Sequence, residues 1–591
     1  MRSTRPVTIL FPCILAYLTA ILLGTPAWAT DYQVGPGQAY ADPVSVPWES
    51  LNAGDTVYIH WRSAAQGGDY HEKVNLTRSG APGNPIHIVG VPGPNGERPC
   101  LNGANAITRT VNSAQNSTYY TGNQARGILC FSEKANGSTT SAGASYWDVS
   151  GLKITGARPA NSFTNSYGQA TSFNYDPKGE SASSGVFIDR GNYLHFSNME
   201  LTNNQNGFFG SSDVRSGQVP RHVHDCILEK SLLYNNGAAN SYTIHNAYVE
   251  LADMTYRWNY FGPLVAGSDG THIKDRGANV LIEGNYFADA NTTMYLDPPE
   301  YSEGWMDQQP GFTTITVRNN VITKTDINTY LGFDLILTGF GNGDPTHDPP
   351  VPPPIPIVRT VNVNNNTFIL TCSQNTNWGV NVFDVSAYPQ IINFDKNVFL
   401  RCVGAGLTPS EIRFVAKFEP GASTATVVNI GTGNYMSYQP TVYPQTSGQY
   451  ANGSITVNGL SNINQLANMT QAQLESLLGI NLHDPSAANY GRFSETANAW
   501  FLAHGAGAAL APLAGDANED GTVSFADYQA LEANFGIFDR TWAQGDFNGD
   551  FMVNFADYQM LETTFGQSIP EPASLTLLAA GILALAGRKR R

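Results

Sequence analysis

Charged and polar side chains recur in three segments that otherwise alternate like β-strands. The segment "THIKDRG" at residues 271–277 lies between "IHNAYVEL" at 244–251 and "TTMYLDPPEY" at 292–301. Successive side chains of a strand point to opposite faces, so the polar residues are expected to share the face opposite the apolar ones. The residues expected on that solvent-facing side are Tyr248, Glu250, His272, Lys274, Arg276, Tyr295 and Asp297, with His245 nearby.

These residue types suit an elimination reaction on an acidic sugar. In a lyase of this kind, a base removes the proton next to a uronate carboxylate, and a cation stabilises the negative charge that develops. Lys274 is the candidate base if burial or neighbouring cations lower its pKa from about 10. Arg276 is the candidate for stabilising that charge or binding the carboxylate in two-pronged fashion. His245 or Tyr248 is the candidate for protonating the leaving oxygen.

Hydrolysis is the alternative chemistry for the same cluster. A glycoside hydrolase needs two carboxylates placed across the scissile bond. Glu250, Asp275 and Asp297 are available, but no spacing in the sequence selects a pair, so elimination is the preferred prediction. In either case His272, Tyr295 and Asp297 are expected to contact the substrate. A groove that only holds a glycan is the non-enzymatic alternative.

Part of the cluster also has a structural explanation. "IDRGNYLHFSN" at 188–198 repeats the pattern of "KDRGANVLIEGN" at 274–285 with one residue fewer. Both copies place Asp-Arg-Gly before an apolar strand. Asp275 is therefore expected to accept backbone hydrogen bonds in a turn, and the glycine to relieve strain there. His272 and Lys274 have no counterpart in the earlier copy, which favours a functional role for them.

The surrounding chain has the pattern of a solenoid of short strands. Only 14% of its 591 residues are charged, and Gly (58), Asn, Ser and Thr are abundant, as in turns and strands rather than helices. Between residues 30 and 435 a short apolar strand recurs with an Asn near its end, which predicts an all-β, parallel β-helix. Asn tolerates left-handed backbone at a corner, and stacked Asn amides bond from rung to rung. The recurring residues are Asn198, Asn259, Asn285, Asn320, Asn366 and Asn397.

Three further regions complete this part of the chain. The segment 31–61, which ends in "GDTVYIHW", resembles the start of right-handed parallel β-helix proteins and implies that hand of winding. Residues 324–358 form the longest insertion, and the prolines of "DPPVPPPIPI" predict an extended loop beside the coil. Residues 436–512 are expected to be a cap and linker region. Within it, "NGSITVNGL" is a candidate strand, and Thr470 and Gln473 predict the capping box of a helix.

A duplicated unit at residues 513–568 carries the pattern of a calcium-binding loop. The copies "GDANEDGTVSFADYQALEANFG" and "GDFNGDFMVNFADYQMLETTFG" place oxygen donors at EF-hand-like spacing. In the second copy Phe551 replaces the turn glycine, Gly521, which predicts weaker binding. The predicted ligands are Asp516, Asn518, Asp520, Thr522, Ser524 and Asp527 in the first copy, and Asp546, Asn548, Asp550, Met552, Asn554 and Asp557 in the second. Thr522 and Met552 would each contribute a backbone carbonyl.

The duplicated unit resembles a type I dockerin, a small α-helical EF-hand-like module. That resemblance implies calcium as a cofactor and a cohesin as a partner. A calcium-folded stalk is the alternative.

Both ends of the chain carry export signals. Residues 1–29 combine a basic start, an apolar run and the cleavage site Ala27-Trp28-Ala29, as in a secretory signal peptide. Residues 569–591 combine Pro-Glu-Pro, a short apolar segment and a basic end. This tail resembles the PEP-CTERM sorting signal. The resemblance implies processing by an exosortase and transient anchoring by a short transmembrane segment, before delivery to the cell surface or extracellular matrix. Cys100 could pair with Cys130, and Cys372 with Cys402, or all four could remain buried thiols.

A wider resemblance covers residues 241–300. It is to a group of secreted bacterial right-handed β-helix proteins described as polysaccharide-degrading enzymes. The shared positions are His245, Asn246, Tyr248, Glu250, Lys274, Asp275, Arg276, Leu296 and Asp297. The resemblance implies a polysaccharide substrate, while the net charge of −16 argues against a nucleic-acid partner. We therefore predict a surface-sorted enzyme that degrades a uronate-containing polysaccharide by β-elimination.

Overall fold

The described part of the chain consists of a long coil of strands and a small helical module. This computed structural model describes residues 29–110, 124–132, 143–173, 183–214, 220–288, 292–302, 304–324, 333–338, 358–370, 380–385, 390–401, 412–417, 426–437, 441–442, 455–467, 469–470, 472–473, 476, 513–518, 522–537, 540–549 and 551–568. The predicted signal peptide and the sorting tail lie outside these residues. Within them, no helix is long and apolar enough to cross a membrane.

The strands of the coil form three large sheets, whose described members pair almost entirely in parallel. The first sheet contains β1 (Asp31–Val34), β2 (Thr56–His60), β4 (Ile86–Val91), β8 (Trp147–Ser150), β13 (Leu194–Ser197), β16 (His224–Glu229), β19 (Ala252–Arg257), β22 (Val280–Glu283), β25 (Thr314–Arg318), β28 (Arg359–Asn364), β31 (Gln390–Asp395), β34 (Thr426–Ile430) and β37 (Ile455–Asn458). The second contains β5 (Cys100–Asn102), β9 (Lys153–Thr155), β14 (Glu200–Thr202), β17 (Leu232–Tyr234), β20 (Tyr260–Phe261), β23 (Tyr286–Ala288), β26 (Val321–Lys324), β29 (Thr367–Leu370), β32 (Val398–Arg401), β35 (Tyr435–Met436) and β38 (Asn464–Gln465).

The third sheet carries the candidate site. It contains β11 (Ala170–Ser172), β10 (Ser162–Thr164), β6 (Ala106–Thr108), β3 (Glu72–Leu76), β7 (Gly127–Phe131), β12 (Ser184–Ile188), β15 (Asn206–Ser211), β18 (Ala247–Glu250), β21 (Thr271–Asp275), β24 (Thr292–Leu296), β27 (Phe333–Thr338), β30 (Val380–Val385), β33 (Ile412–Lys417) and β36 (Thr441–Val442). Among these strands, β10 and β11 pair antiparallel. Short 3-10 turns lie at η1 (Pro43–Ser45), η2 (Trp48–Ser50), η3 (Ala64–Gln66), η5 (Met306–Gln308), η7 (Leu460–Asn462) and η9 (Trp542–Gln544).

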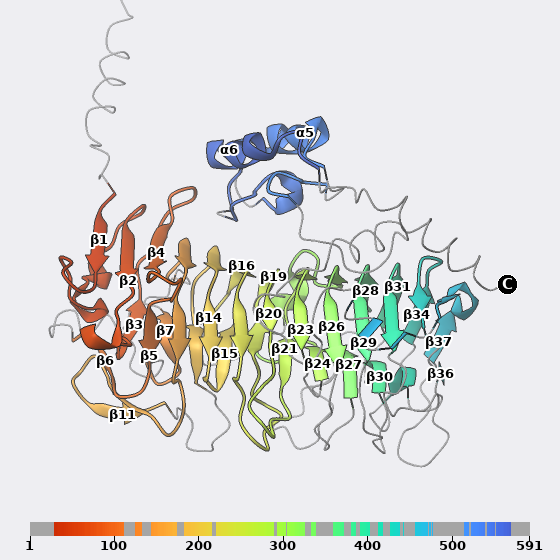
Figure 1. The fold of residues 1–591 in the computed structure, drawn as a ribbon, viewed down its shortest axis with the longest axis horizontal. Helices are drawn as coiled ribbons and strands as arrows, with labels where there is room; N and C mark the ends of the chain where they lie inside the picture. Colours follow the sequence, from red (N-terminus) through yellow and green to blue (C-terminus); the bar gives the residue numbers. More distant parts are fainter. Residues whose placement is uncertain are drawn as a thin grey trace, which may run out of the picture.

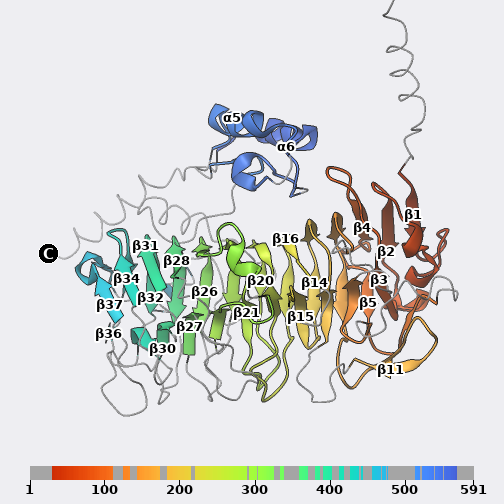
Figure 2. The same cartoon turned by 180° about the vertical axis from the view of Figure 1, so that it is seen from behind.

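From β12 onward, successive strands visit the third, first and second sheets in turn, and each strand pairs with its counterpart one turn later. This path is that of a parallel β-helix, seen along its length in Figure 1 and from behind in Figure 2. The first sheet has one buried and one partly exposed face, as β28 and β31 show by strict alternation of burial. Strands of the third sheet such as β12 and β21 are buried almost throughout, so most of its outer face is covered.

Two boundaries of the predicted coil are wrong. The predicted insertion at 324–358 contains β27, which pairs with β24 and β30, so this segment returns to the third sheet. The proline-rich part of the insertion lies outside the described residues. The coil also continues past residue 435, because β37 and β38 extend the first and second sheets. The candidate strand in "NGSITVNGL" is therefore confirmed, and Thr470 and Gln473 make the capping-box bonds predicted for them.

The asparagine ladder lies at the corner between the first and second sheets. The Asn285 amide donates to Asn320 Oδ1 at 3.0 Å, Asn320 donates to Asn366 at 3.0 Å, and Asn366 donates to Asn397 at 3.1 Å. Asn259 begins this run and Asn434 ends it, although the sequence pattern missed Asn434. Each side chain is buried with its polar atoms paired, which stabilises the corner on every rung.

Asn198 is wrongly assigned to this ladder. Met199 occupies the ladder position on its rung, and its backbone N–H donates to Ser231 Oγ at 3.0 Å. Asn198 instead takes the left-handed backbone conformation, with φ of 53°, as do Asn319 and Asn365 just before their ladder residues. The left-handed corner conformation and the ladder hydrogen bond, both predicted for the same asparagine, therefore belong to consecutive residues.

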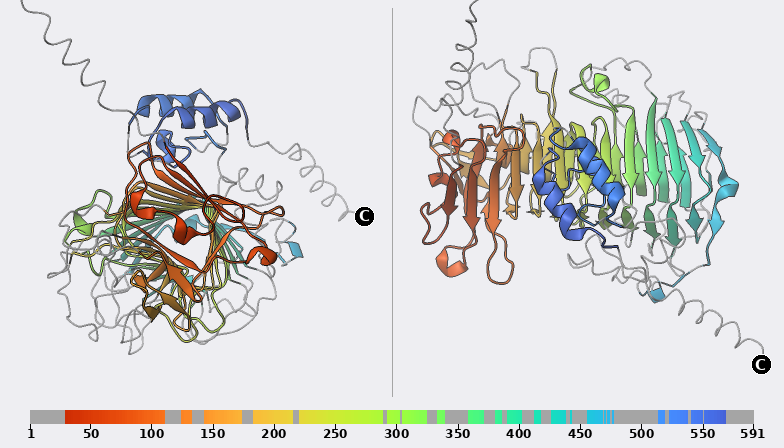
Figure 3. Two further views of the ribbon diagram at one scale, coloured as in Figure 1. Left: turned by 90° about the vertical axis from the view of Figure 1, so that its left-hand side faces the viewer. Right: turned by 90° about the horizontal axis from the view of Figure 1, so that it is seen from above.

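The helical module contains α5 (Phe525–Asn534) and α6 (Phe555–Thr564). Each helix begins at a capping box, formed by Ser524 with Asp527 and by Asn554 with Asp557. The module lies over the first sheet near the middle of the coil, as the end and top views of Figure 3 show. In the coil, Cys100, Cys130 and Cys226 are buried and form no disulfide, so Cys100 and Cys130 do not pair; Cys372 and Cys402 lie outside the described residues.

Candidate functional site

Three half-buried side chains form a row across the outer face of the third sheet. Tyr248 on β18 lies in register with Lys274 on β21, which lies in register with Tyr295 on β24. The Lys274 ammonium is 5.2 Å from the centre of the Tyr248 ring and 5.7 Å from that of Tyr295. The parallel ladder thus places a lysine between two tyrosines, with 13% of the lysine side chain exposed.

An ion cluster lies beside this row. Arg276 Nη2 is 3.6 Å from Asp297 Oδ2 and 3.3 Å from Glu300 Oε2, and its Nη1 donates to the Pro298 carbonyl. Lys274 Nζ lies 3.9 Å from Asp297 Oδ2. The Tyr248 hydroxyl donates to Glu300 Oε2 at 3.0 Å. Arg276 is therefore engaged by protein groups and almost fully buried, which contradicts its predicted solvent-facing orientation.

Glu250 fixes the segment that carries Glu300. Its Oε1 accepts three backbone N–H bonds, from Glu300, Tyr301 and Ser302, together with the Ser302 hydroxyl. Glu250 is 1% exposed, and burial raises its pKa to about 7 against the opposing effects of Ser302 and Arg276. Glu250 points away from the core residues Val249 and Leu251 as predicted, but its predicted exposure to solvent is wrong, because the segment after β24 covers it.

His245 is buried beside the row of Tyr248, Lys274 and Tyr295, and one hydrogen bond defines its tautomer. The backbone N–H of Thr271 donates to His245 Nδ1 at 3.0 Å, so Nδ1 acts as an acceptor. Burial, followed by the charges of Lys274 and Arg276, holds the pKa of His245 well below its usual value. The neutral ring therefore carries its proton on Nε2, which has no hydrogen-bond partner among the described residues. The ring centre is 5.6 Å from that of Tyr248 and 6.3 Å from that of Tyr295.

The environment of Lys274 favours its neutral form. Burial is the main cause, and the charge of Arg276 adds to it, while Asp297, Glu300 and Glu250 oppose it. The result lowers the pKa of Lys274 to about 8. Tyr248 shows the opposite change, because burial raises its pKa well above the usual value and keeps its hydroxyl protonated. The row thus pairs a lysine that can accept a proton near neutral pH with a tyrosine that retains one.

His272 is not on this surface, which contradicts its predicted solvent-facing position. It is fully buried at the corner between the second and third sheets, where it contacts the Asn246 amide at 3.0 Å and the Ala288 carbonyl at 2.9 Å. Burial lowers the pKa of His272 to about 3, so the ring is neutral. The first residues of β21 lie at this corner, where strand alternation no longer determines which side chains reach solvent.

Asp275 lies on the inner side of the sheet. Its Oδ1 accepts the Gly277 N–H at 2.7 Å, as expected of a turn, and its Oδ2 accepts the Tyr256 hydroxyl at 2.9 Å. Asp297 has no exposed surface either, so it meets Lys274 and Arg276 rather than solvent. The earlier copy of the turn matches in detail, because Arg190 donates to the Pro220 carbonyl as Arg276 does to Pro298.

Glu300 was missed as a member of this cluster. It is part of the quoted segment "DPPEY", but it follows two prolines and lies beyond the strand whose alternation guided the prediction. Burial raises the pKa of Glu300, but Arg276 and Lys274 outweigh it and hold the pKa below its usual value. The sequence therefore shows an acidic residue shortly after Leu-Asp, but strand alternation does not predict where the side chain of a residue beyond the strand will lie.

The two repeat loops are built around pairs of buried carboxylates. Asp546 accepts the backbone N–H groups of Gly549 and Phe551, at 2.7 and 3.0 Å, and Asp557 accepts those of Phe547 and Asn548. In the first loop, Asp527 accepts the N–H groups of Ala517 and Asn518. The predicted ligands Asp516, Asp527, Asp546 and Asp557 are all buried.

Other predicted ligands have capping roles or lie elsewhere. Ser524 and Asn554 accept N–H groups as the N-caps of α5 and α6. Asp520 and Asp550 lie outside the described residues, and the residues that are described contain no group of three or more His, Cys, Asp or Glu that could hold a metal. A loop that gathers buried carboxylate oxygens nevertheless fits the preference of Ca²⁺ for hard oxygen ligands.

Comparison with known proteins identifies one motif and several similar folds. The PEP-CTERM protein-sorting motif matches residues 568–591, so the C-terminal tail is a sorting signal of that type. No curated protein matches the chain. An alginate lyase from Paenibacillus sp. str. FPU-7 is 13% identical with a TM-score of 0.27, over 71% of this chain and 94% of that one.

Two further solved structures are similar at the same level. The A-module of an Azotobacter vinelandii mannuronan C-5 epimerase is 10% identical with a TM-score of 0.32, over 70% of this chain and 92% of that one. A pectate lyase is 10% identical with a TM-score of 0.30, over 74% and 79%. At such values these likenesses carry no argument about activity, which rests on the site itself.

Proposed function

We propose that the chain degrades a uronate-containing polysaccharide by β-elimination on the outer face of the third sheet. The observation that carries this proposal is the position of Lys274, which is partly exposed between two tyrosines and has a pKa of about 8. In the proposed reaction, neutral Lys274 removes the proton next to the uronate carboxylate. Tyr248 or the Nε2–H of His245 then gives a proton to the leaving oxygen.

Arg276 has a supporting role in this proposal. Its guanidinium is bound to Asp297, Glu300 and Pro298, so it is not available to grip a substrate carboxylate. Its charge instead disfavours protonation of Lys274. Glu300 is the least buried acid of the cluster, and its bond with Tyr248 orients the tyrosine ring.

The burial of the carboxylates favours elimination over hydrolysis. A hydrolase needs two carboxyl groups facing the substrate from opposite sides. Among the described residues of the cluster, Glu250, Asp275 and Asp297 are buried and hold protein groups. Glu300 alone of these acids keeps some exposed surface, at 14% of its side chain.

A panel of acidic polysaccharides tests the proposed reaction. The mature chain would be incubated with pectin, alginate and glycosaminoglycans, and the ultraviolet absorbance of unsaturated uronate would be followed. Product formation that is lost in Lys274→Ala is expected. New reducing ends without unsaturated product would instead favour hydrolysis. Binding without any cleavage of the panel would favour a non-catalytic glycan-binding protein.

We also propose that the repeat loops bind calcium as dockerin-like units. Asp516 and Asp527 would hold the ion in the first loop, and Asp546 and Asp557 in the second, because these carboxylates are buried inside the loops. Bound calcium would offset the repulsion between the carboxylates of each loop. Isothermal titration with CaCl₂ tests this, and Asp527→Asn with Asp557→Asn is expected to abolish the heat of binding.

A further inference from the structure

The second repeat loop lies directly on the first sheet of the coil. The ring of Phe551 is 5.5 Å from that of Tyr193, in an edge-to-face contact. Trp542, on η9, meets Trp258 in the same manner at 5.0 Å, and Arg257 lies over the rings of both tryptophans. Trp258 and Trp542 belong to one apolar cluster, so the module and the coil share a packed core.

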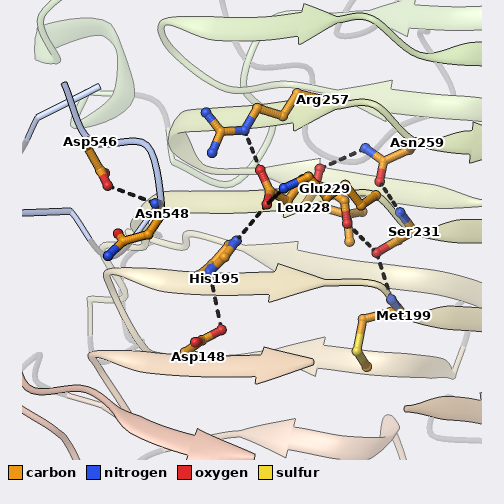
Figure 4. Close-up of polar contacts among 12 residues, drawn as sticks. Asp148, His195, Met199, Leu228, Glu229, Ser231, Arg257, Asn259, Asp546 and Asn548 are labelled. Atoms are coloured by element: carbon orange, nitrogen blue, oxygen red, sulfur yellow. Dashed lines mark hydrogen bonds and ion pairs between the residues drawn. The ribbon is translucent and has the colours of Figure 1, made fainter. Parts of the chain in front are cut away.

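A row of alternating charges lies beneath this loop on the coil. His195 Nδ1 is 3.2 Å from Asp148, and its Nε2 is 3.3 Å from Glu229, which also pairs with Arg257. Figure 4 shows Asp546 and Asn548 beside this row. Burial disfavours the charged imidazole, but hydrogen bonds with Asp148 and Glu229 outweigh it and raise the pKa of His195 to about 10.

Gly549 allows the loop to approach this row closely. Its φ is +77°, and a Cβ added there would lie 3.3 Å from both Arg257 Nη2 and His195 Nε2. Each of these contacts is tighter than an ordinary one. A side chain at residue 549 would therefore push the loop away from the coil, in addition to the backbone strain.

Phe551 explains why the second copy departs from the loop pattern. It takes the left-handed conformation, with φ of 64°, at the loop position where the sequence of the first copy has Gly521. A side chain is unfavourable at such a position. Yet Phe551 is only 8% exposed, because its ring is the anchor on Tyr193. The substitution that weakens the predicted calcium loop thus supplies its contact with the coil.

We propose that the second repeat loop is a calcium-dependent clasp whose partner is the first sheet of the same chain. This rests on the proposed calcium binding, because Gly549 and Phe551 are inside the loop and their N–H groups bind the carboxylate of Asp546. While the clasp is closed, this face of the module is occupied and is not available to a cohesin. The sorting tail begins at residue 568, directly after the module. The closed clasp therefore holds the first sheet toward the anchoring end, and the module does not cover the partly exposed Lys274 on the third sheet.

A disulfide trap tests the clasp in the full mature chain. Gly83 of the coil faces the Met552 sulfur, so the pair Gly83→Cys and Met552→Cys is expected to cross-link when the module is docked. Cross-linking under mild oxidation would be followed by non-reducing gel mobility, with calcium and with a chelator. We expect at least a fivefold lower yield after chelation, and a larger radius of gyration by solution scattering for the untrapped chain.

Two phenylalanines of the module supply a matched pair of variants. Phe551→Ser removes the anchor and is expected to lower the cross-link yield even with calcium present. Phe555→Ser changes a residue that is 61% exposed and is expected to leave the yield unchanged. Equal yields for both variants would overturn the proposed contact.

The calcium titration and the cross-link yield test calcium binding and docking of the module separately. A yield that does not respond to chelation, in a chain that titrates with calcium, would overturn the clasp while leaving the proposed calcium binding intact. A chain that shows no heat of calcium binding would overturn both. Absence of the cross-link in every condition would overturn the docked arrangement itself.

Discussion

The pH dependence of product formation tests the assignment of Lys274 most directly. A protonated amine cannot accept a proton, so the rate should rise as pH increases through the lysine pKa of about 8. With that value, about a tenth of the enzyme has neutral Lys274 at pH 7 and about nine-tenths at pH 9. We therefore expect kcat/KM for the unsaturated product to rise about tenfold between these pH values. For comparison, a lysine with the usual pKa of about 10.4 would have on the order of a hundredfold less neutral amine at pH 8.

The assay is initial-rate ultraviolet absorbance on the best polysaccharide of the panel, across pH 6 to 10. Lys274→Arg keeps a positive charge beside Asp297 but removes the base, and it is expected to lose about 10²–10⁴ in kcat/KM. Circular dichroism would establish that the variant remains folded. Lys274 is not the base if Lys274→Arg keeps the wild-type rate, or if the wild-type pH profile of kcat/KM is flat between pH 7 and 9.

Variants at buried polar residues distinguish structural from catalytic roles. Asn320→Ala should lower the free energy of unfolding by about 2–3 kcal/mol in urea denaturation, because it leaves buried amide partners unpaired. Asn393→Ala, which removes a partly exposed bond to Asn362 Oδ1, should lower it by under about 1 kcal/mol. His272→Leu should lower Tm and leave kcat/KM unchanged below the transition, since its contacts are internal; a loss of kcat/KM at unchanged Tm would contradict this. Glu250→Gln should retain most activity, because an amide oxygen can still accept the N–H groups of residues 300–302. Glu250→Ala should release that segment and raise its hydrogen exchange, and equal exchange in both variants would argue against this role.

Much of the fold could be predicted because a coil repeats a local pattern. The strand around Ile282 and the buried Asn285 recur on later rungs as Val317 with Asn320 and Val363 with Asn366. Such repeats predict both the parallel pairing and the ladder. The assignment of Asn198 failed because the sequence shows two adjacent asparagines on some rungs and one on others. Only the register distinguishes the left-handed corner residue from the ladder residue.

The candidate site could be predicted only in part. Alternation correctly brought Tyr248, Lys274 and Tyr295 into one row, because the parallel register places them opposite one another on three successive strands. It failed for His272, which lies near the start of β21 and turns into the corner between the second and third sheets. It also could not predict the burial of Arg276, which depends on Asp297, Pro298 and Glu300 from the end of β24 and beyond.

The strand period, the duplicated loops and the sorting tail can be read from the sequence, because each of these is encoded by residues close together in the chain. Which charges meet depends on the tertiary fold. Glu300 reaches Arg276 because Glu250, on a neighbouring rung, binds the backbone that carries it. Phe551 reaches Tyr193 because the module folds back over the first sheet. Buried charges and anchoring rings need partners from distant segments, and no local pattern specifies how those segments approach each other.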